Sequence, residues 1–164
     1  MAFDSFIKID GIPGESTDDK HKDWIELLSY SHGVNQPKSV VSSAGSMSSQ
    51  RADFHDFTIT KVVDKASPKL MAACASGEHF SEVDVEICRA GGDKQKYMEY
   101  KLTDVITTSF RPGGQASDSE NLPTEVVTFS YGKIEMTYTQ TDKATGKAAG
   151  QVPAGWDLKL NKKV

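Results

Sequence analysis

Apolar and polar residues alternate with a period of two along most of the chain, which is the pattern of β-strands that bury one face. The clearest case is the segment 83–87, in which Val83, Val85 and Ile87 alternate with acidic residues. The same period predicts further strands, which are 5–10, 24–32, 54–63, 97–110, 124–138 and 156–160. The chain is therefore predicted to be mainly β.

One segment changes the period from two to that of a helix. Ser67 is a favourable N-cap, and Pro68 follows at the first helical position, where its missing N–H costs nothing. Gly77 supplies a left-handed stop. The pattern predicts one helix over about residues 67–77, and its narrow apolar stripe favours a position on the flank of a sheet.

The phase of the apolar positions changes within the strand 124–138. Its first half buries odd positions such as Phe129, whereas its second half buries even positions such as Ile134. The change falls at Gly132, which predicts a β-bulge there.

Three segments are predicted to be loops. Residues 33–51 are rich in Gly, Ser, Asn, Gln and Pro, and a loop longer than about 12–15 residues is usually functional. Residues 111–123 and 142–155 are the other two. The length of 164 residues suits a single domain over 1–164. Short strands and one helix together favour an antiparallel β-barrel or two-sheet sandwich with one flanking α-helix.

The charge balance gives no reason to expect nucleic acid or an anionic membrane surface as a partner. Nineteen Lys and Arg face 23 Asp and Glu, for a net charge of −4. No apolar run approaches the ~20 residues of a membrane span. The N-terminal segment carries Asp4 and lacks the basic and apolar regions of a signal peptide. We expect the chain to be made, and at first kept, in the cytosol.

Motifs for catalysis and cofactor binding are missing from the sequence. It contains no GxSxG elbow, no P-loop and no dinucleotide fingerprint, so we expect no enzyme and no cofactor. A catalytic pair of carboxylates stays open, because acids are plentiful and nothing singles one out.

Cysteine and histidine give no metal prediction. Cys74 and Cys88 do not form a CxxC pair, so we expect two reduced thiols packed as small hydrophobes, with a redox pair as the alternative. His21 lies among three acids, and His55 lies between two. Solvated histidines in charged surroundings explain both patterns more simply than metal ligands do.

Hydroxyl residues occupy the second face of several strands. They are Thr103, Thr107 and Ser109 in one strand, Thr128 and Ser130 in another, and Ser29, Ser31, Thr58 and Thr60 elsewhere. The simple explanation is that Thr favours strands and hydroxyls suit a wet face. The functional interpretation is a surface that stays wet without charge, such as a conduit wall or docking surface. Closure of such subunits into a ring would pair the exposed sheet edges.

A set of short segments occurs in the same order as in a known family. The segments are 6–11, 14–16, 24–31 with Gly33 and Gln36-Pro37, 57–61, 64–68, 74–79, 88–92, 124–129 and 155–156. Together they resemble the hemolysin-coregulated protein family, the tube subunits of the bacterial type VI secretion system. The resemblance spans essentially the whole chain.

The resemblance implies a structural subunit of a homohexameric ring. Rings of the family stack into a hollow tube, which a contractile sheath expels and a spike protein caps, and small effector proteins are carried inside the rings. It also implies export without a Sec signal peptide. Ser31 matches a position that faces the ring interior, and Gln115 is a second candidate for effector contact. The segment 39–50 corresponds to an extended loop between rings, so the stacking candidates are Val40, Val41, Ser43 and Met47.

Two other classes of function remain as alternatives. A monomeric β-barrel that binds a small ligand would need an apolar cavity with a few polar groups. A hydrolase would need a histidine or an acid with a strongly perturbed pKa in a cleft.

Overall fold

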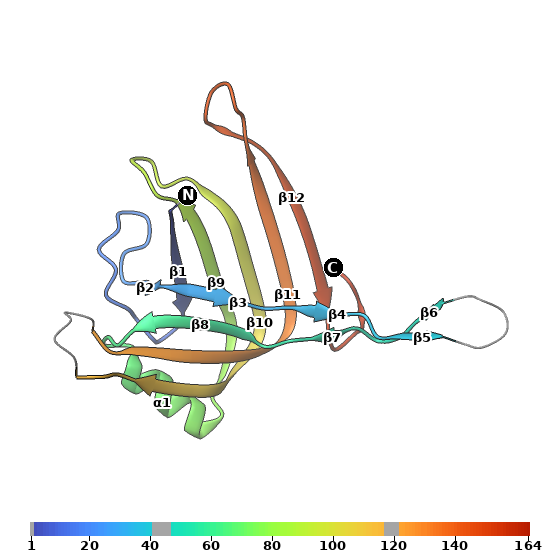
Figure 1. The fold of residues 1–164 in the computed structure, drawn as a ribbon, viewed down its shortest axis with the longest axis horizontal. Helices are drawn as coiled ribbons and strands as arrows, with labels where there is room; N and C mark the ends of the chain where they lie inside the picture. The colour runs from blue at the N-terminus through green and yellow to red at the C-terminus, as the bar shows by residue number, and fades with distance from the viewer. Residues whose placement is uncertain (1, 41–46, 117–121) are drawn as a thin grey trace.

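The computed structural model describes residues 2–40, 47–116 and 122–164 (Figure 1). One helix, α1 (Ser67–Ser76), lies among strands. The strands are β1 (Phe3–Ile9), β2 (Ile25–Leu27), β3 (Ser29–Ser31), β4 (Val34–Asn35), β5 (Lys38–Val40), β6 (Met47–Ser49), β7 (Asp53–Phe54), β8 (Phe57–Val62), β9 (His79–Arg89), β10 (Lys96–Gly113), β11 (Thr124–Thr141), β12 (Ala148–Asp157) and β13 (Lys162–Lys163).

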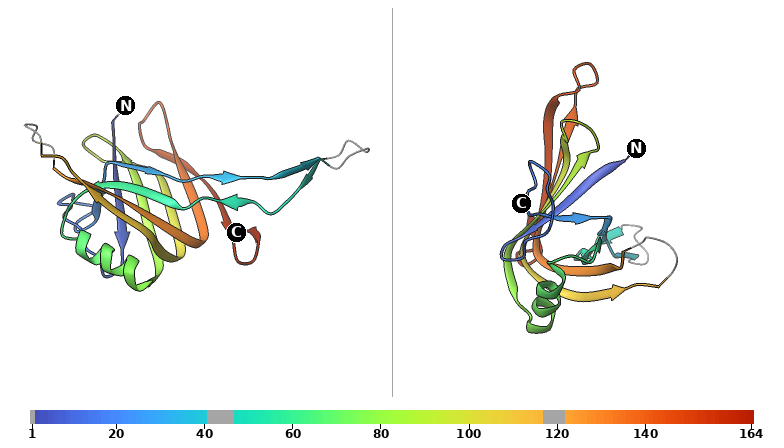
Figure 2. Two further views of the ribbon diagram at one scale, coloured as in Figure 1. Left: turned by 60° about the horizontal axis from the view of Figure 1, so that its bottom comes forward. Right: turned by 90° about the vertical axis from the view of Figure 1, so that its left-hand side faces the viewer.

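The main sheet forms two layers that share the long strands β10 and β11 (Figures 1 and 2). One layer has the strand order β13-β12-β11-β10-β9-β1-β2. In the other layer, β8 pairs with the first half of β11, and β3 pairs with β8. The pairings are antiparallel, and over the described residues the sheet does not close into a barrel. The predicted class, mainly β with one flanking helix, is confirmed in its two-layer form.

The segment predicted as one strand, 24–32, consists of two short strands that belong to different layers. β2 pairs with β1, whereas β3 pairs with β8. The chain changes layer at Leu28, whose side chain is exposed and whose N–H donates to the Thr60 carbonyl at 2.8 Å. The buried positions change from odd (Ile25, Leu27) to even (Tyr30) at this crossing, but the exposed apolar Leu28 hides the change in the sequence.

The predicted change of phase in β11 is present, but the β-bulge at Gly132 is not. Tyr131 and Ile134 are both buried, while the ladder with β10 stays in register on either side of Gly132. Opposite Gly132 lies Asp104, which adopts a left-handed φ of 54°. At this residue the buried positions change between even and odd numbers, although no residue is inserted in either strand. The register shift between β10 and β11 lies farther along, between Thr107 and Ser109.

Helix α1 packs against β10 and buries Leu70 and Ala73. It ends at Gly77, which has the predicted left-handed conformation with φ 68°. Its N-cap is Ala66 rather than the predicted Ser67, because the Ser67 hydroxyl is engaged with Glu125 inside the protein. Within the described ranges, we find no helix with the length and hydrophobicity of a membrane span.

All three predicted loops are partly strand. The segment 33–51 contains β4, β5 and β6, which with β7 form an extended two-stranded arm beside the body of the protein (Figure 1). The segment 142–155 contains most of β12, which ends at Asp157 and so replaces the short strand expected over 156–160. β12 is exposed over most of its length. Since it buries no face, its sequence has no alternation to detect. β10 also runs three residues into the loop expected over 111–123.

A charged pair lies in the core where β8, β11 and α1 meet. Lys61 and Glu125 are both fully buried, and the Lys61 ammonium donates to the Glu125 carboxylate. The ammonium also donates to the Asp64 carboxylate at 2.8 Å, and the Ser67 hydroxyl donates to Glu125 at 2.8 Å. Buried charges need such partners, because their desolvation is otherwise uncompensated. The network therefore joins two strands to the start of the helix.

Replacing Glu125 by Gln should lower the free energy of unfolding by about 3 kcal/mol, because it leaves the Lys61 charge buried with Asp64 as its remaining carboxylate. Urea unfolding measures the loss. Glu82→Gln, at an exposed position of β9, should stay within about 0.5 kcal/mol of the parent chain. A double variant, Lys61→Met with Glu125→Leu, should recover most of the stability. Equal stability of Glu125→Gln and the parent would contradict the account.

Asp104→Val should lower stability by about 1–2 kcal/mol, since a β-branched residue is strained at positive φ. Asp104→Asn should retain most of it, because Asn tolerates the left-handed region. Both variants lose the ion pair of Asp104 with Lys159, so their difference reports on the backbone. Thermal unfolding followed by circular dichroism makes the comparison. Indistinguishable variants would show that the left-handed residue does not matter.

Candidate functional site

A row of four hydroxyls crosses the outer face of the β3-β8-β11 layer. Ser31 pairs with Thr58, Thr58 with Thr128, and Thr128 with Ser109 of β10. The hydroxyl oxygens of Thr58 and Thr128 lie 3.4 Å apart. Because side chains alternate across a strand, these residues share one face, away from the core. We call this surface the hydroxyl face.

The next row of the hydroxyl face is similar. Ser29 pairs with Thr60, Thr60 with Val126, and Val126 with Arg111. Arg111 is thus the single charge in the two rows. The face is polar enough to stay hydrated and has little charge with which to hold one particular ligand.

The outer face of the other layer is different, because charges alternate across it. Lys8 pairs with Asp84, Asp84 with Lys101, and Lys101 with Glu135. Desolvation, with a smaller contribution from Glu82, raises the pKa of the Asp84 carboxyl above its usual value. The two outer faces of the molecule therefore present different chemistry to a partner.

Aromatic side chains support the hydroxyl face from the core side. Tyr30, between Ser29 and Ser31, stacks on Phe57 with ring centroids 6.0 Å apart. His32 also stacks on Phe57, and burial lowers its pKa. Tyr131 donates its phenolic proton to the His55 carbonyl at 2.8 Å, and burial raises the pKa of this tyrosine to about 12. This packing fixes the position of β3, and with it that of Ser31.

The structure brings most, but not all, of the predicted hydroxyls together. Thr107 is buried and its hydroxyl faces the core without a hydrogen-bond partner, contrary to the prediction. The reason is the turn of the alternation at Asp104, after which β10 buries the odd positions Val105 and Thr107 as far as the register shift before Ser109. Thr103, on the other side of that turn, pairs with Lys133 and not with the hydroxyl rows.

The candidates for contact and stacking lie in three places. Ser31 is exposed in the first hydroxyl row, whereas Gln115 is exposed beyond the last ladder pair of β10, Gly113 with Thr124. The two therefore do not share a row. Val40 and Met47 pair with each other at the far end of the arm. Val41 and Ser43 lie outside the described residues.

His21 is not solvated, contrary to the expectation from its charged surroundings. Its side chain is 2% exposed and stacks on Phe6 with centroids 4.2 Å apart. Cys88, on β9, is also buried. Desolvation, with a smaller contribution from the charge of Glu86, raises the pKa of its thiol to about 11. The thiol is thus protonated, as a packed cysteine is expected to be. No periodicity in the sequence connects His21 with Cys88, since they are distant in the chain.

The other histidine with acidic neighbours in the sequence, His55, does not bind them in the structure. Its Nε2 lies 3.0 Å from the Asn35 side-chain nitrogen, a contact that joins the base of the arm to the body.

The two alternative functions gain no support from the described residues. Core side chains pack between the layers of the described residues, and one hollow, lined by Glu99, Lys101 and Glu135, lies on the charged outer face. Acids with lowered pKa are held in ion pairs: Lys94 and His21 lower the pKa of Asp18 to about 2, and Lys159 lowers that of Asp104.

Comparison with known proteins gives a consistent family. The family model described as "Type VI secretion system effector, Hcp" matches residues 6–138. The chain is 37% identical to "Protein hcp1" of Pseudomonas aeruginosa over 163 residues, with 98% of each chain covered. It is 31% identical to the "Major exported protein" of the same species over 135 residues, covering 76% of this chain and 74% of that protein.

Solved structures give the same result. A structure described as that of a type six secretion system protein matches with a TM-score of 0.92 and 38% identity, covering 99% of this chain and 100% of the other. Hcp1 from Salmonella typhimurium matches with a TM-score of 0.82 and 32% identity, with both chains fully covered. The resemblance expected from the sequence is confirmed, and the chain belongs to the Hcp family of type VI secretion system proteins.

Proposed function

We propose that the chain is a non-catalytic tube subunit that assembles into hexameric rings and carries small effector proteins in their bore. The observation that carries the proposal is the hydroxyl face, a surface that is wet and nearly uncharged. Such a wall lets folded proteins of different charge pass or rest without strong adhesion. The name of the matching "Major exported protein" supports export of the chain.

Exposed apolar residues supply a reason for self-association. The second half of β11 and β12 form a hairpin that projects from the body (Figure 1), and it exposes Met136, Tyr138 and Val152. Val152 is 64% exposed in the single chain. Exposed apolar patches mark interaction surfaces, and a neighbouring subunit would cover this one.

The arm formed by β4 to β7 suits contact between rings. It extends from one side of the body and ends at the pair of Val40 with Met47 (Figure 2). A projecting two-stranded element offers unpaired edges and side chains to a subunit of the next ring. The sheath and the spike protein would then meet the assembled tube rather than the single subunit.

The assembly predicts a particle of about six times the 17.9 kDa mass of one chain in multi-angle light scattering. Val152→Asp places a charge in the apolar hairpin and should lower that mass towards the single chain. Met71→Asp, at an exposed apolar position of α1, is the matched control and should leave the mass unchanged. A stable single chain at micromolar concentration would contradict the proposal.

Replacing Ser31 by Gln should remove effector binding while the rings persist, because the longer side chain stands in the first hydroxyl row. The tagged chain is isolated from a host with an active type VI system, and mass spectrometry measures the effectors that copurify. Ser81→Gln makes the same change at an exposed position of β9 and should retain them. Retention by Ser31→Gln would exclude this row from the contact.

A further inference from the structure

The segment between β1 and β2 folds back over the outer face of β1 and β9. Its two ends are held together by hydrogen bonds, from Gly14 N–H to the Asp23 carbonyl at 2.8 Å and from Asp23 N–H to the Ser16 carbonyl at 2.9 Å. Gly14 is required for this approach, since a Cβ there would lie 2.3 Å from the Trp24 carbonyl oxygen. The fold of the segment thereby fixes His21 against the sheet, between the rings of Phe6 and Trp24.

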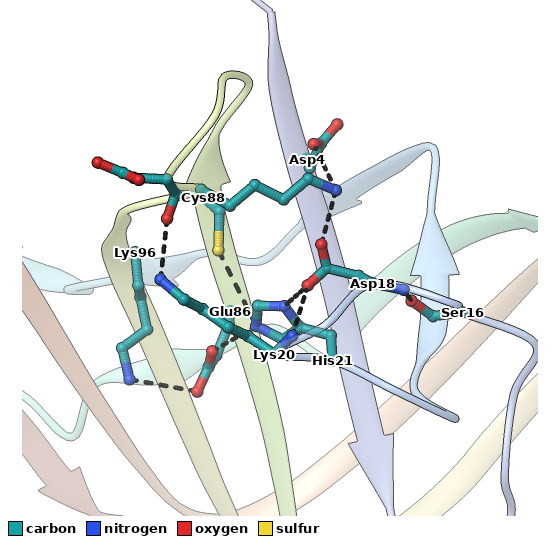
Figure 3. Close-up of polar contacts among 10 residues, drawn as sticks. Asp4, Ser16, Asp18, Lys20, His21, Glu86, Cys88 and Lys96 are labelled. Carbon is teal, nitrogen blue, oxygen red and sulfur yellow. Dashed lines mark hydrogen bonds and ion pairs between the residues drawn. The ribbon is translucent and has the colours of Figure 1, made fainter.

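Both nitrogens of the His21 ring meet side chains (Figure 3). Nδ1 lies 2.7 Å from an Asp18 carboxylate oxygen, and Nε2 lies 2.7 Å from a carboxylate oxygen of Glu86. The Cys88 sulfur is 4.0 Å from the same Nε2. Glu86 and Cys88 are two residues apart on β9, so the strand period places both on the face that the segment covers.

We propose that His21, Glu86 and Cys88 form a binding site for a divalent transition-metal ion of the Zn²⁺ class. The three side chains offer an imidazole nitrogen, a carboxylate oxygen and a sulfur, which together are the ligand types of zinc. One ligand atom from each residue lies within 4.8 Å of the others. Water would complete a four-coordinate site.

The geometry is close to what such an ion needs. Ligand atoms around tetrahedral zinc are about 3.3–3.6 Å apart, given Zn–N and Zn–S distances of about 2.0 and 2.3 Å. The oxygen of Glu86 would move away from the His21 nitrogen by a fraction of an ångström, and the Cys88 sulfur would approach it by a similar amount. Side-chain rotation supplies shifts of this size without a change in the strands.

Asp18 provides the supporting contact that metal-binding histidines usually have. A carboxylate that accepts from Nδ1 of a ligand histidine fixes the tautomer with a free lone pair on Nε2. Asp18 is held in turn by Lys94, whose ammonium lies 2.8 Å from its other oxygen. The residue that positions the ring is therefore itself positioned.

The remaining charges around the site leave room for an ion. Lys96 bonds the second carboxylate oxygen of Glu86 at 3.2 Å and also contacts Glu99 at 3.0 Å. It can stay with Glu99 when the ion takes Glu86. Glu86 is partly exposed, which gives the ion a route from solvent. On binding, the thiol proton of Cys88 and the proton shared by His21 and Glu86 are released to water. The ion would tie the segment 15–24 to β9.

The test uses the untagged full chain with Zn²⁺ in calorimetry and Co²⁺ in absorption spectroscopy. We expect one ion per chain, a thiolate-to-cobalt charge-transfer band, and a rise in the unfolding temperature on addition of Zn²⁺. Cys88→Ser should abolish the charge-transfer band. Cys74→Ser, which changes the other free cysteine, is the matched control and should retain it.

Asp18→Asn provides a second variant that keeps all three ligands, and it should weaken Zn²⁺ affinity by about 10–100-fold. Near-UV circular dichroism confirms that each variant is folded. The proposal is overturned if the parent chain binds neither ion in excess, if its cobalt spectrum lacks the thiolate band, or if Cys74→Ser and Cys88→Ser lose the band equally. It is also overturned if folded Asp18→Asn binds Zn²⁺ as tightly as the parent.

Discussion

Two strands of this protein have to serve both layers of the fold, and the rest of the structure depends on how they do so. The first half of β10 and the second half of β11 belong to one layer of the sheet. Their other halves belong to the second layer, with β8 and β3. In a regular strand, either the odd-numbered or the even-numbered residues face the core throughout. In β11 the buried positions change from odd to even numbers at Gly132, opposite the left-handed Asp104, so that both halves bury apolar residues. In β10 they change at Asp104 and again at the register shift between Thr107 and Ser109. The hydroxyl face lies on the outside of the second layer, where Thr128 of β11 pairs with Ser109 of β10.

The buried ion pair of Lys61 with Glu125 complements that arrangement. It lies where β8, β11 and the start of α1 meet, so it links the second layer to the helix that flanks it. A pair of apolar residues could fill the same volume, but it would not fix the direction of the helix start through Ser67. The charged pair therefore specifies an arrangement as well as filling space, which is a role attributed to buried polar groups in some proteins.

The sequence predicts the strands that bury one face throughout. It does not predict strands that bury neither face, or strands in which the buried positions change between odd and even numbers. The strand around Val85 and the stop at Gly77 follow from local patterns. The sequence does not predict most of β12, because its Gly- and Ala-rich stretch is exposed on the single chain. The hydroxyl face was predicted from alternation, with Thr107 misplaced by the turn at Asp104. The cluster around His21 could not be predicted, because Glu86 lies 65 positions farther along the chain than His21.

The hydroxyl face and the charged outer face differ in chemistry, and the central proposal is that six copies enclose a bore lined by the hydroxyl face. Electron cryomicroscopy of the purified chain tests this most directly. The account predicts rings with a central opening, in which Ser31 and Thr128 face the opening and the alternating charges of Lys8, Asp84 and Lys101 lie elsewhere. Solitary particles, or rings whose opening is lined by those charges, would contradict it.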